Sequence, residues 1–238
     1  MEWHGEGTVI GRARHGEHGV ILQVMTRDLG RLAGMVPGGA SARKAAMLQP
    51  GARLVLRHRA RLADQLGTFT PEPLRARASV LSDGDALAGL NAVCALLVWA
   101  LPERDPHPAL HDRTELLLDA IEAGGDWHLP YLRWEMALLQ DLGFGLDLGR
   151  CAVTGRRDGL AYVSPKTGRA VSAAAAGDWA PRLLPLPAVL GGVGNGGVSD
   201  GLRLTGAFLQ AHLAEGLVGR PIPAARDRLV ARLARSGD

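Results

Sequence analysis

The chain has 238 residues, 47% of them hydrophobic, and a formal net charge of +3, so it can build one large domain or two unequal ones. Its N-terminus lacks the basic and apolar regions of a secretory signal, and no apolar run approaches the ~18 residues of a membrane span. Because Cys94 and Cys151 are its two cysteines, the composition excludes a disulfide framework and predicts a cytoplasmic protein.

The first 80 residues consist of short β-rich runs separated by turn signals such as Gly38-Gly39. Alternating apolar positions predict strands over 8–14, 20–26, 31–37, 52–62 and 68–77. Five strands of this length favour a closed or nearly closed barrel, because closure removes the exposed sheet edges, and the OB-fold is the common solution of that size. We therefore expect an OB-fold domain over residues 1–80.

After Ser82 the apolar residues recur every three or four positions, which predicts helices over 82–100, 108–123, 130–142, 200–217 and 224–235. Ser82 or Asp83 is the expected N-cap of the first of these helices. Residues 151–172 are turn-rich and predict a hairpin, and Gly191–Gly197 predicts a loop. The expected fold class is α+β: a five-stranded OB-fold barrel, then a mainly α-helical domain over 81–238 that includes a hairpin insertion at 150–178.

Charge is distributed unevenly over these segments. Residues 1–80 carry 12 basic and 6 acidic side chains, residues 81–150 carry 4 and 12, and residues 151–238 carry 11 and 6. A basic module that precedes an acidic one favours nucleic-acid binding by the first. Of the 27 basic residues only Lys44 and Lys166 are lysines, and a biased genomic base composition is an alternative explanation of so many arginines.

The run from Arg53 to Arg61 carries the clearest pattern, since a strand sends alternate side chains to opposite faces. Arg53, Arg57, Arg59 and Arg61 share one face, which suits phosphate contacts and base stacking. The alternative is an ordinary solvated outer face. The predicted nucleic-acid-binding residues are Arg12, Arg14, Arg27, Arg31, Arg43, Lys44, Arg53, Arg57, Arg59, Arg61, Arg75 and Arg77.

No catalytic or metal-binding pattern stands out. Gly192 to Gly197 spell a GxGxxG sequence, but the prolines at 185 and 187 and the lack of a βαβ unit argue against a dinucleotide site. His15 and His18, and His107 with His111 and Asp112, lack the further ligands of a metal site and are expected at the surface. We expect a protein without enzymatic activity, cofactor or metal.

Several stretches, taken in order, resemble the RecO family of bacterial recombination mediators. They are Gly16–Leu22, Thr26–Leu32 and Leu48–Gly51 in the barrel, then Leu132–Glu135 and Leu142–Gly145, followed by Cys151. Many members of that family carry two pairs of zinc-binding cysteines in the second domain. Here Thr154, Ser172 and Ala175 stand where three of those cysteines are expected. One thiolate cannot hold a structural zinc ion, so we predict a degenerate, metal-free, zinc-ribbon-like hairpin.

The resemblance implies a nucleoid-associated mediator that binds single- and double-stranded DNA, anneals complementary strands and helps RecA replace single-strand-binding protein (SSB). It implies RecR and SSB as partners. It also implies that the C-terminal tail of SSB docks beside Arg133, where Tyr131, Trp134 and Leu138 would form an apolar groove. An intrahelical salt bridge is the alternative role of Arg133. For the whole chain, the alternatives are a protein–protein adaptor whose barrel touches no nucleic acid, and an enzyme acting on nucleic acid.

Overall fold

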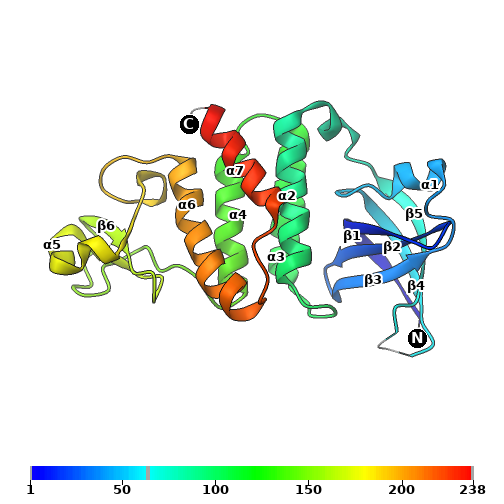
Figure 1. Cartoon of the computed structure of the whole chain (residues 1–238), viewed down its shortest axis with the longest axis horizontal. Coiled ribbons are helices and arrows are strands. Elements are labelled where there is room, and N and C mark those ends of the chain that lie inside the picture. The colour runs from blue at the N-terminus through cyan, green and yellow to red at the C-terminus, as the bar shows by residue number, and fades with distance from the viewer. Residues whose placement is uncertain (1, 63–64, 237–238) are drawn as a thin grey trace. The chain divides into compact units, whose positions relative to one another are not determined.

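The computed structural model describes residues 2–62 and 65–236 and divides into two compact units (Figure 1). The first comprises Met1–Gly125 and Pro223–Leu229, and the second comprises Asp126–Ile222 and Val230–Asp238. The first unit therefore includes, beside the barrel, two helices that follow it in the chain. In the described residues no helix combines the length and apolar character that crossing a membrane requires.

The first unit contains the predicted five-stranded barrel, which is closed. Its strands pair in the order β1-β2-β3-β5-β4, and every pairing is antiparallel except β3 with β5. The strands are β1 (Glu2–His15), β2 (Gly19–Thr26), β3 (Gly30–Val36), β4 (Arg53–Arg59) and β5 (Thr68–Arg75). A short helix between β3 and β4, α1 (Ala42–Met47), was not predicted, because six residues are too few to show a helical period.

The barrel interior is filled by the alternate side chains that the strand period directs inward. Leu22, Leu54, Leu56 and Phe69 are all fully buried there. A Cβ added to Gly34 would lie only 2.5 Å from the Phe69 ring. Glycine at this position of β3 lets the ring of β5 approach closely, at the seam where the barrel closes.

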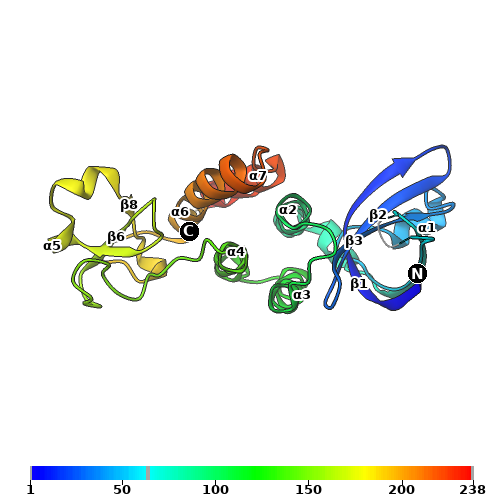
Figure 2. The same ribbon diagram turned by 90° about the horizontal axis from the view of Figure 1, so that it is seen from below.

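Two helices follow the barrel in the first unit, after a short 3₁₀ turn, η1 (Ala78–Ser82). α2 (Gly84–Ala100) packs against β1 and α3 (Figure 2). Its N-cap is Asp83, which is one of the two predicted caps. The Asp83 carboxylate accepts hydrogen bonds from the amide groups of Asp85 and Ala86. α3 (Pro108–Ala123) begins with a proline and ends before Gly124, as its pattern predicts.

The second unit is built on α4 (His128–Asp141), which packs against α6 (Val198–Phe208). The predicted hairpin consists of β6 (Leu160–Val163) and β7 (Ala170–Ser172), and the unpredicted β8 (Leu184–Pro185) extends it in the order β7-β6-β8. Shorter elements are α5 (Ala173–Ala176), η2 (Gly177–Arg182) and η3 (Ala188–Leu190).

The predicted helix 200–217 is present but changes its geometry partway. It continues from α6 as a π-helix, η4 (Leu209–Leu217), in which the His212 ring stacks against Phe144 and Phe208. The widened turn is a change that apolar periodicity does not reveal. The last helix, α7 (Ala224–Ser236), has residues in both units.

Candidate nucleic-acid interface

The outer face of β4 carries Arg53, Arg57 and Arg59, as the alternation predicts. Leu54, Leu56 and His58 are buried on the other face, while Arg57 and Arg59 are exposed and Arg53 is half-exposed. Arg61 is also exposed but lies beyond the end of the strand. The side chains are therefore placed where a phosphate backbone could reach three of the four arginines along one strand.

The neighbouring strand neutralises most of this arginine face. In the β1–β4 register Glu2 lies opposite Arg59 and Glu6 lies opposite Val55. Arg59 Nε is 3.1 Å and Arg57 Nε 4.0 Å from Glu2 Oε1, and Arg53 Nη2 is 2.6 Å from Glu6 Oε2. Three guanidinium groups thus share two carboxylates, so the face carries mixed charge.

Arg77, predicted to bind nucleic acid, is instead buried, with a side chain only 1% exposed. Its guanidinium donates hydrogen bonds to the Gly51 carbonyl at 2.6 Å, to Glu115 at 3.1 Å and to Asp119 at 2.6 Å. Arg75, at the end of β5, pairs with Asp119 and Glu122. The carboxylates of α3 therefore form ion pairs with both arginines, and Arg77 is not accessible to a phosphate.

Burial and ion pairing act against each other at Asp119. Partial burial alone would raise the pKa of its carboxyl group. The hydrogen bonds and positive charges of Arg77 and Arg75 outweigh burial and lower that pKa below its usual value. Asp119 is therefore charged in the folded protein throughout the neutral range and holds both arginines.

Arg27 and Arg31 are also paired. Arg27 binds both carboxylate oxygens of Asp112, which raises the pKa of Arg27 and lowers that of Asp112. Arg31 donates to Gln23 and lies 3.7 Å from Glu103. Two of the predicted DNA-binding residues on the loop after β2 and on β3 are thus already held by carboxylates of the same unit.

Four other cations form a different group, which we call the β1–α1 cluster: Arg12, Arg14, Arg43 and Lys44. In the described part of the chain none of the four has a carboxylate within ion-pair distance, and Arg12 and Lys44 donate only to the backbone carbonyls of Ala45 and Pro37. A cavity of about 380 Å³ opens beside them, lined by Arg12, Arg14, Val20, Gly39, Ala40 and the neighbouring Ala45. Unlike the arginines of β4, the four cations of this cluster are not compensated by ion pairs in the described part of the chain.

In the second unit, the residues predicted to bind the SSB tail separate into two groups. Arg133 is exposed on α4, whereas Tyr131, Trp134 and Leu138 are at most 2% exposed. The Tyr131 hydroxyl donates to Glu135, whose other oxygen accepts from Thr205. The three apolar residues lie on the stripe of α4 that faces the core, so they do not form an open groove beside Arg133.

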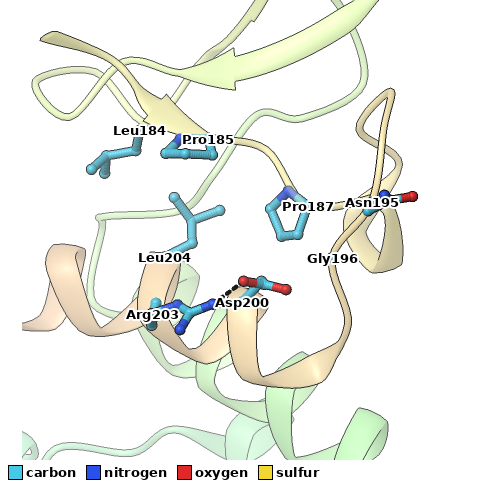
Figure 3. Close-up of a pocket in the computed structure, with 8 residues that line it drawn as sticks. All are labelled: Leu184, Pro185, Pro187, Asn195, Gly196, Asp200, Arg203 and Leu204. Carbon is cyan, nitrogen blue, oxygen red and sulfur yellow. Dashed lines mark hydrogen bonds and ion pairs between the residues drawn. The ribbon is translucent and has the colours of Figure 1, made fainter. Parts of the chain in front are cut away.

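The second unit also has a cavity of about 500 Å³ between β8, the loop at residues 191–197 and α6 (Figure 3). Its apolar walls come from Leu184, Pro185, Pro187 and Leu204. Arg203 pairs with Asp200 at its rim, and this hydrogen bond lowers the pKa of the Asp200 carboxyl.

The loop with the GxGxxG spelling does lead to the N-terminus of α6. There the Asp200 carboxylate accepts the Gly197 amide at 3.0 Å and so occupies the end of the helix. A phosphate at that position would meet a negative charge, which agrees with the rejection of a dinucleotide site.

The hairpin region of the second unit brings Cys151 together with Thr154 and Ser172, two of the three residues predicted to replace zinc-binding cysteines. The Cys151 thiol accepts hydrogen bonds from the amide and, at 3.5 Å, the hydroxyl of Ser172, and Thr154 bonds to it as well. Burial would raise the pKa of Cys151, but these hydrogen bonds lower it to about 6. One thiol with two hydroxyl groups does not fit the nitrogen and sulfur donors of a structural zinc site.

Two family models match the chain. They are "Recombination protein O N terminal", over residues 1–77, and "Recombination protein O C terminal", over residues 81–221. Three curated relatives, each named DNA repair protein RecO, are similar to the chain over nearly its full length. The protein from Paracoccus denitrificans (strain Pd 1222) is 66% identical over 236 residues, covering 99% of this chain and 98% of the relative.

The relative from Ruegeria sp. (strain TM1040) is 54% identical over 239 residues, and one from Cereibacter sphaeroides (strain ATCC 17025 / ATH 2.4.3) is 55% identical over 238 residues. Both alignments cover 99% of this chain and 99% of the relative. The likeness thus includes both the barrel and the helical region.

Proposed function

Since the chain belongs to the RecO family of DNA repair proteins, we propose that it is a non-catalytic mediator that binds single- and double-stranded DNA. In this role it anneals complementary strands and assists RecA loading onto SSB-coated DNA. The β1–α1 cluster is the observation that carries the proposal. Its cations carry no carboxylate partner among the described residues, and guanidinium groups in such a setting favour phosphate contacts.

The β4 face is the weaker candidate for the primary contact. A phosphate that approaches Arg53 or Arg59 must compete with Glu6 or Glu2 for the same guanidinium group. The β1–α1 cluster has no such competitor, and displacing a backbone carbonyl from Arg12 or Lys44 leaves no unpaired charge. We therefore assign the larger share of the phosphate contacts to the cluster.

The test compares Arg12→Ala/Arg14→Ala/Arg43→Ala/Lys44→Ala with a control that removes the same number of cations, Arg53→Ala/Arg57→Ala/Arg59→Ala/Arg61→Ala, in single-stranded DNA titrations at two salt concentrations. Each lost phosphate contact lowers the salt slope of single-strand binding by about 0.7, so the cluster variant is expected to bind more weakly with a flatter slope. The control is expected to change less. An unchanged affinity and slope in the cluster variant would contradict the assignment, and absence of salt-sensitive binding by the unaltered protein would favour the adaptor alternative.

Family membership also supports RecR and SSB as partners, and we propose the second unit as the receptor of the SSB tail. An apolar, acidic peptide end needs a cation for its carboxylate and an apolar surface beside it. Arg133 is an exposed cation on α4. The apolar walls of the cavity in Figure 3, with Arg203 at the rim, supply the kind of surface that the buried Tyr131, Trp134 and Leu138 do not.

Calorimetric titration of an SSB-tail peptide into the full chain tests this second proposal. Arg133→Ala and Arg203→Ala are compared with Arg150→Ala, an exposed arginine of the same unit. We expect at least one of the first two variants to bind the peptide more weakly than the control variant does. If all three bind it as the unaltered protein does, the tail docks elsewhere or not at all.

A further inference from the structure

Trp179 and Arg182 form an exposed pair on η2, outside every surface described so far. The Trp179 side chain is 64% exposed, and the Arg182 guanidinium carbon lies 5.3 Å from the centre of its ring. By contrast Trp99, Trp127 and Trp134 are buried, and Trp3 packs against the barrel core. Among the described residues, Trp179 is therefore the one tryptophan with a largely exposed side chain.

The local geometry explains why the two side chains meet. In a 3₁₀-helix each turn takes three residues, so side chains at positions i and i+3 eclipse each other. η2 spans Gly177–Arg182, with Trp179 and Arg182 three residues apart. The flat guanidinium group can therefore stack on the indole. The result is a planar, cationic platform that solvent can reach.

The stretch of chain from Asp147 to Arg182, which ends in this pair, has more basic than acidic side chains. Arg156 pairs with Asp158 and Arg169 with Asp147. Four further cations have no carboxylate within ion-pair distance among the described residues, and these are Arg150, Arg157, Lys166 and Arg182. Asp178 is the one carboxylate in η2. Arg182 thus supplies a cation beside the exposed ring, in a stretch of chain with net positive charge.

The residues beside Trp179 in η2 indicate which ligand class fits. Asp178, Pro181 and Arg182 are exposed, and Ala180 is the one small apolar residue between them. A protein partner that buries a tryptophan usually needs an apolar surface around the ring. A nucleobase needs only the ring face and a cation for its phosphate.

We propose that Trp179 and Arg182 form a second nucleic-acid contact, on which one unpaired base of single-stranded DNA stacks. This inference rests on the proposed DNA-binding function and adds a base-contacting site to the phosphate-contacting cluster. Bases within a duplex are already stacked on their neighbours, so the site distinguishes single-stranded from double-stranded DNA.

Fluorescence anisotropy titrations of the full chain with a labelled oligothymidine, and with an abasic oligonucleotide of the same length, test the proposal. Trp179→Ala should weaken oligothymidine binding by at least about fivefold, the loss expected for one base–aromatic stack. It should leave abasic binding and the salt slope unchanged, since no phosphate contact is lost. Trp179→Phe should retain most of the affinity. Val153→Ala, which trims another exposed apolar residue of this unit, is the matched control and should bind like the unaltered protein.

Equal binding of oligothymidine by Trp179→Ala and the unaltered protein would overturn the inference, as would an equal loss on the abasic strand. The inference would also be overturned if Trp179→Ala weakened binding to SSB or RecR but not to DNA, because the ring would then contact a protein partner. If the unaltered protein binds no DNA, the proposed function itself fails. If the cluster variant loses DNA binding while Trp179→Ala does not, only the present inference fails.

Discussion

Arginine has opposite roles at two positions only two residues apart in the chain. Arg75 is partly exposed at the end of β5, whereas Arg77 is enclosed by Glu115, Asp119 and the Gly51 carbonyl. Removing water from a charge is costly unless hydrogen bonds and opposite charges replace it. Arg77 has both, so it serves the fold of the first unit and not its surface.

Arg77→Ala should destabilise the protein by about 3 kcal/mol, because it leaves the mostly buried Glu115 without a cation, with only the Thr8 hydroxyl still donating to it, and the Gly51 carbonyl without its donor. Arg75→Ala, which removes a partly exposed guanidinium from Asp119 and Glu122, should change the stability much less. Urea unfolding followed by circular dichroism measures both. Similar midpoints for the two variants would contradict the structural role of Arg77.

The same cluster predicts part of the acid sensitivity. Because the pKa of Asp119 is lowered in the folded state, its contribution to stability is complete above the ordinary aspartate pKa of about 3.9 and is lost as the pH falls through the lowered value. Unfolding experiments below about pH 4 should therefore show a shallower pH dependence in Arg77→Ala than in the unaltered protein.

At the scale of single elements, the turn that begins at Cys151 is held by hydrogen bonds. The Gly155 amide donates to the Cys151 carbonyl at 2.9 Å, and the Cys151 amide donates to the Arg156 carbonyl at 2.7 Å. The thiol lies between Thr154 and Ser172. These contacts join the turn to the end of β7 and can hold the hairpin closed without an ion.

The prediction for this element is a thiol that ionises with a pKa of about 6. Ultraviolet absorbance of the thiolate, recorded as the pH is raised, should show this step in the unaltered protein. Ser172→Ala should move it to higher pH because it removes the hydroxyl that donates to the thiol, although the backbone amide of residue 172 can still donate. Cys151→Ser identifies the step by removing it, since burial raises the pKa of Cys94 to about 12. A step at the ordinary cysteine value would contradict the hydrogen-bonded arrangement.

At the scale of the molecule, the arrangement of carboxylates decides which arginines are available to DNA. In the first unit, acidic residues of β1 lie beside the arginines of β4. Acidic residues of α3 lie beside Arg75 and Arg77, at and just after the end of β5. The β1–α1 cluster has no such neighbours among the described residues. The basic surface is therefore much smaller than the count of basic residues suggests.

Removing the neighbouring carboxylates should enlarge that surface. Glu2→Gln/Glu6→Gln releases Arg53, Arg57 and Arg59 from their ion pairs, so single-stranded DNA should bind more tightly and with a steeper salt slope. Asp126→Asn/Glu215→Gln, at two exposed positions of the second unit, controls for the change in net charge. Binding by the double variant that matches this control would place the β4 face away from the DNA.

Short-range patterns alone determined much of the architecture. The alternation from Arg53 to Arg59 assigned each side chain of β4 to its face, and the helix over 108–123 follows from its period, its first proline and its final glycine. Strand and helix periods are properties of neighbouring residues, so they can be read along the chain. The charge and exposure of a particular arginine are different, because they depend on residues far away in sequence.

Only the tertiary structure paired Glu2 and Glu6 with the arginines of β4, enclosed Arg77 against α3 and brought Thr154 and Ser172 to the thiol of Cys151. It also turned Tyr131, Trp134 and Leu138 into the core while Arg133 stayed at the surface. Strand order and helix packing decide these contacts, since they bring together residues whose spacing in the chain carries no period. The sequence therefore determined that the barrel is basic, and the fold decided which of its cations remain free.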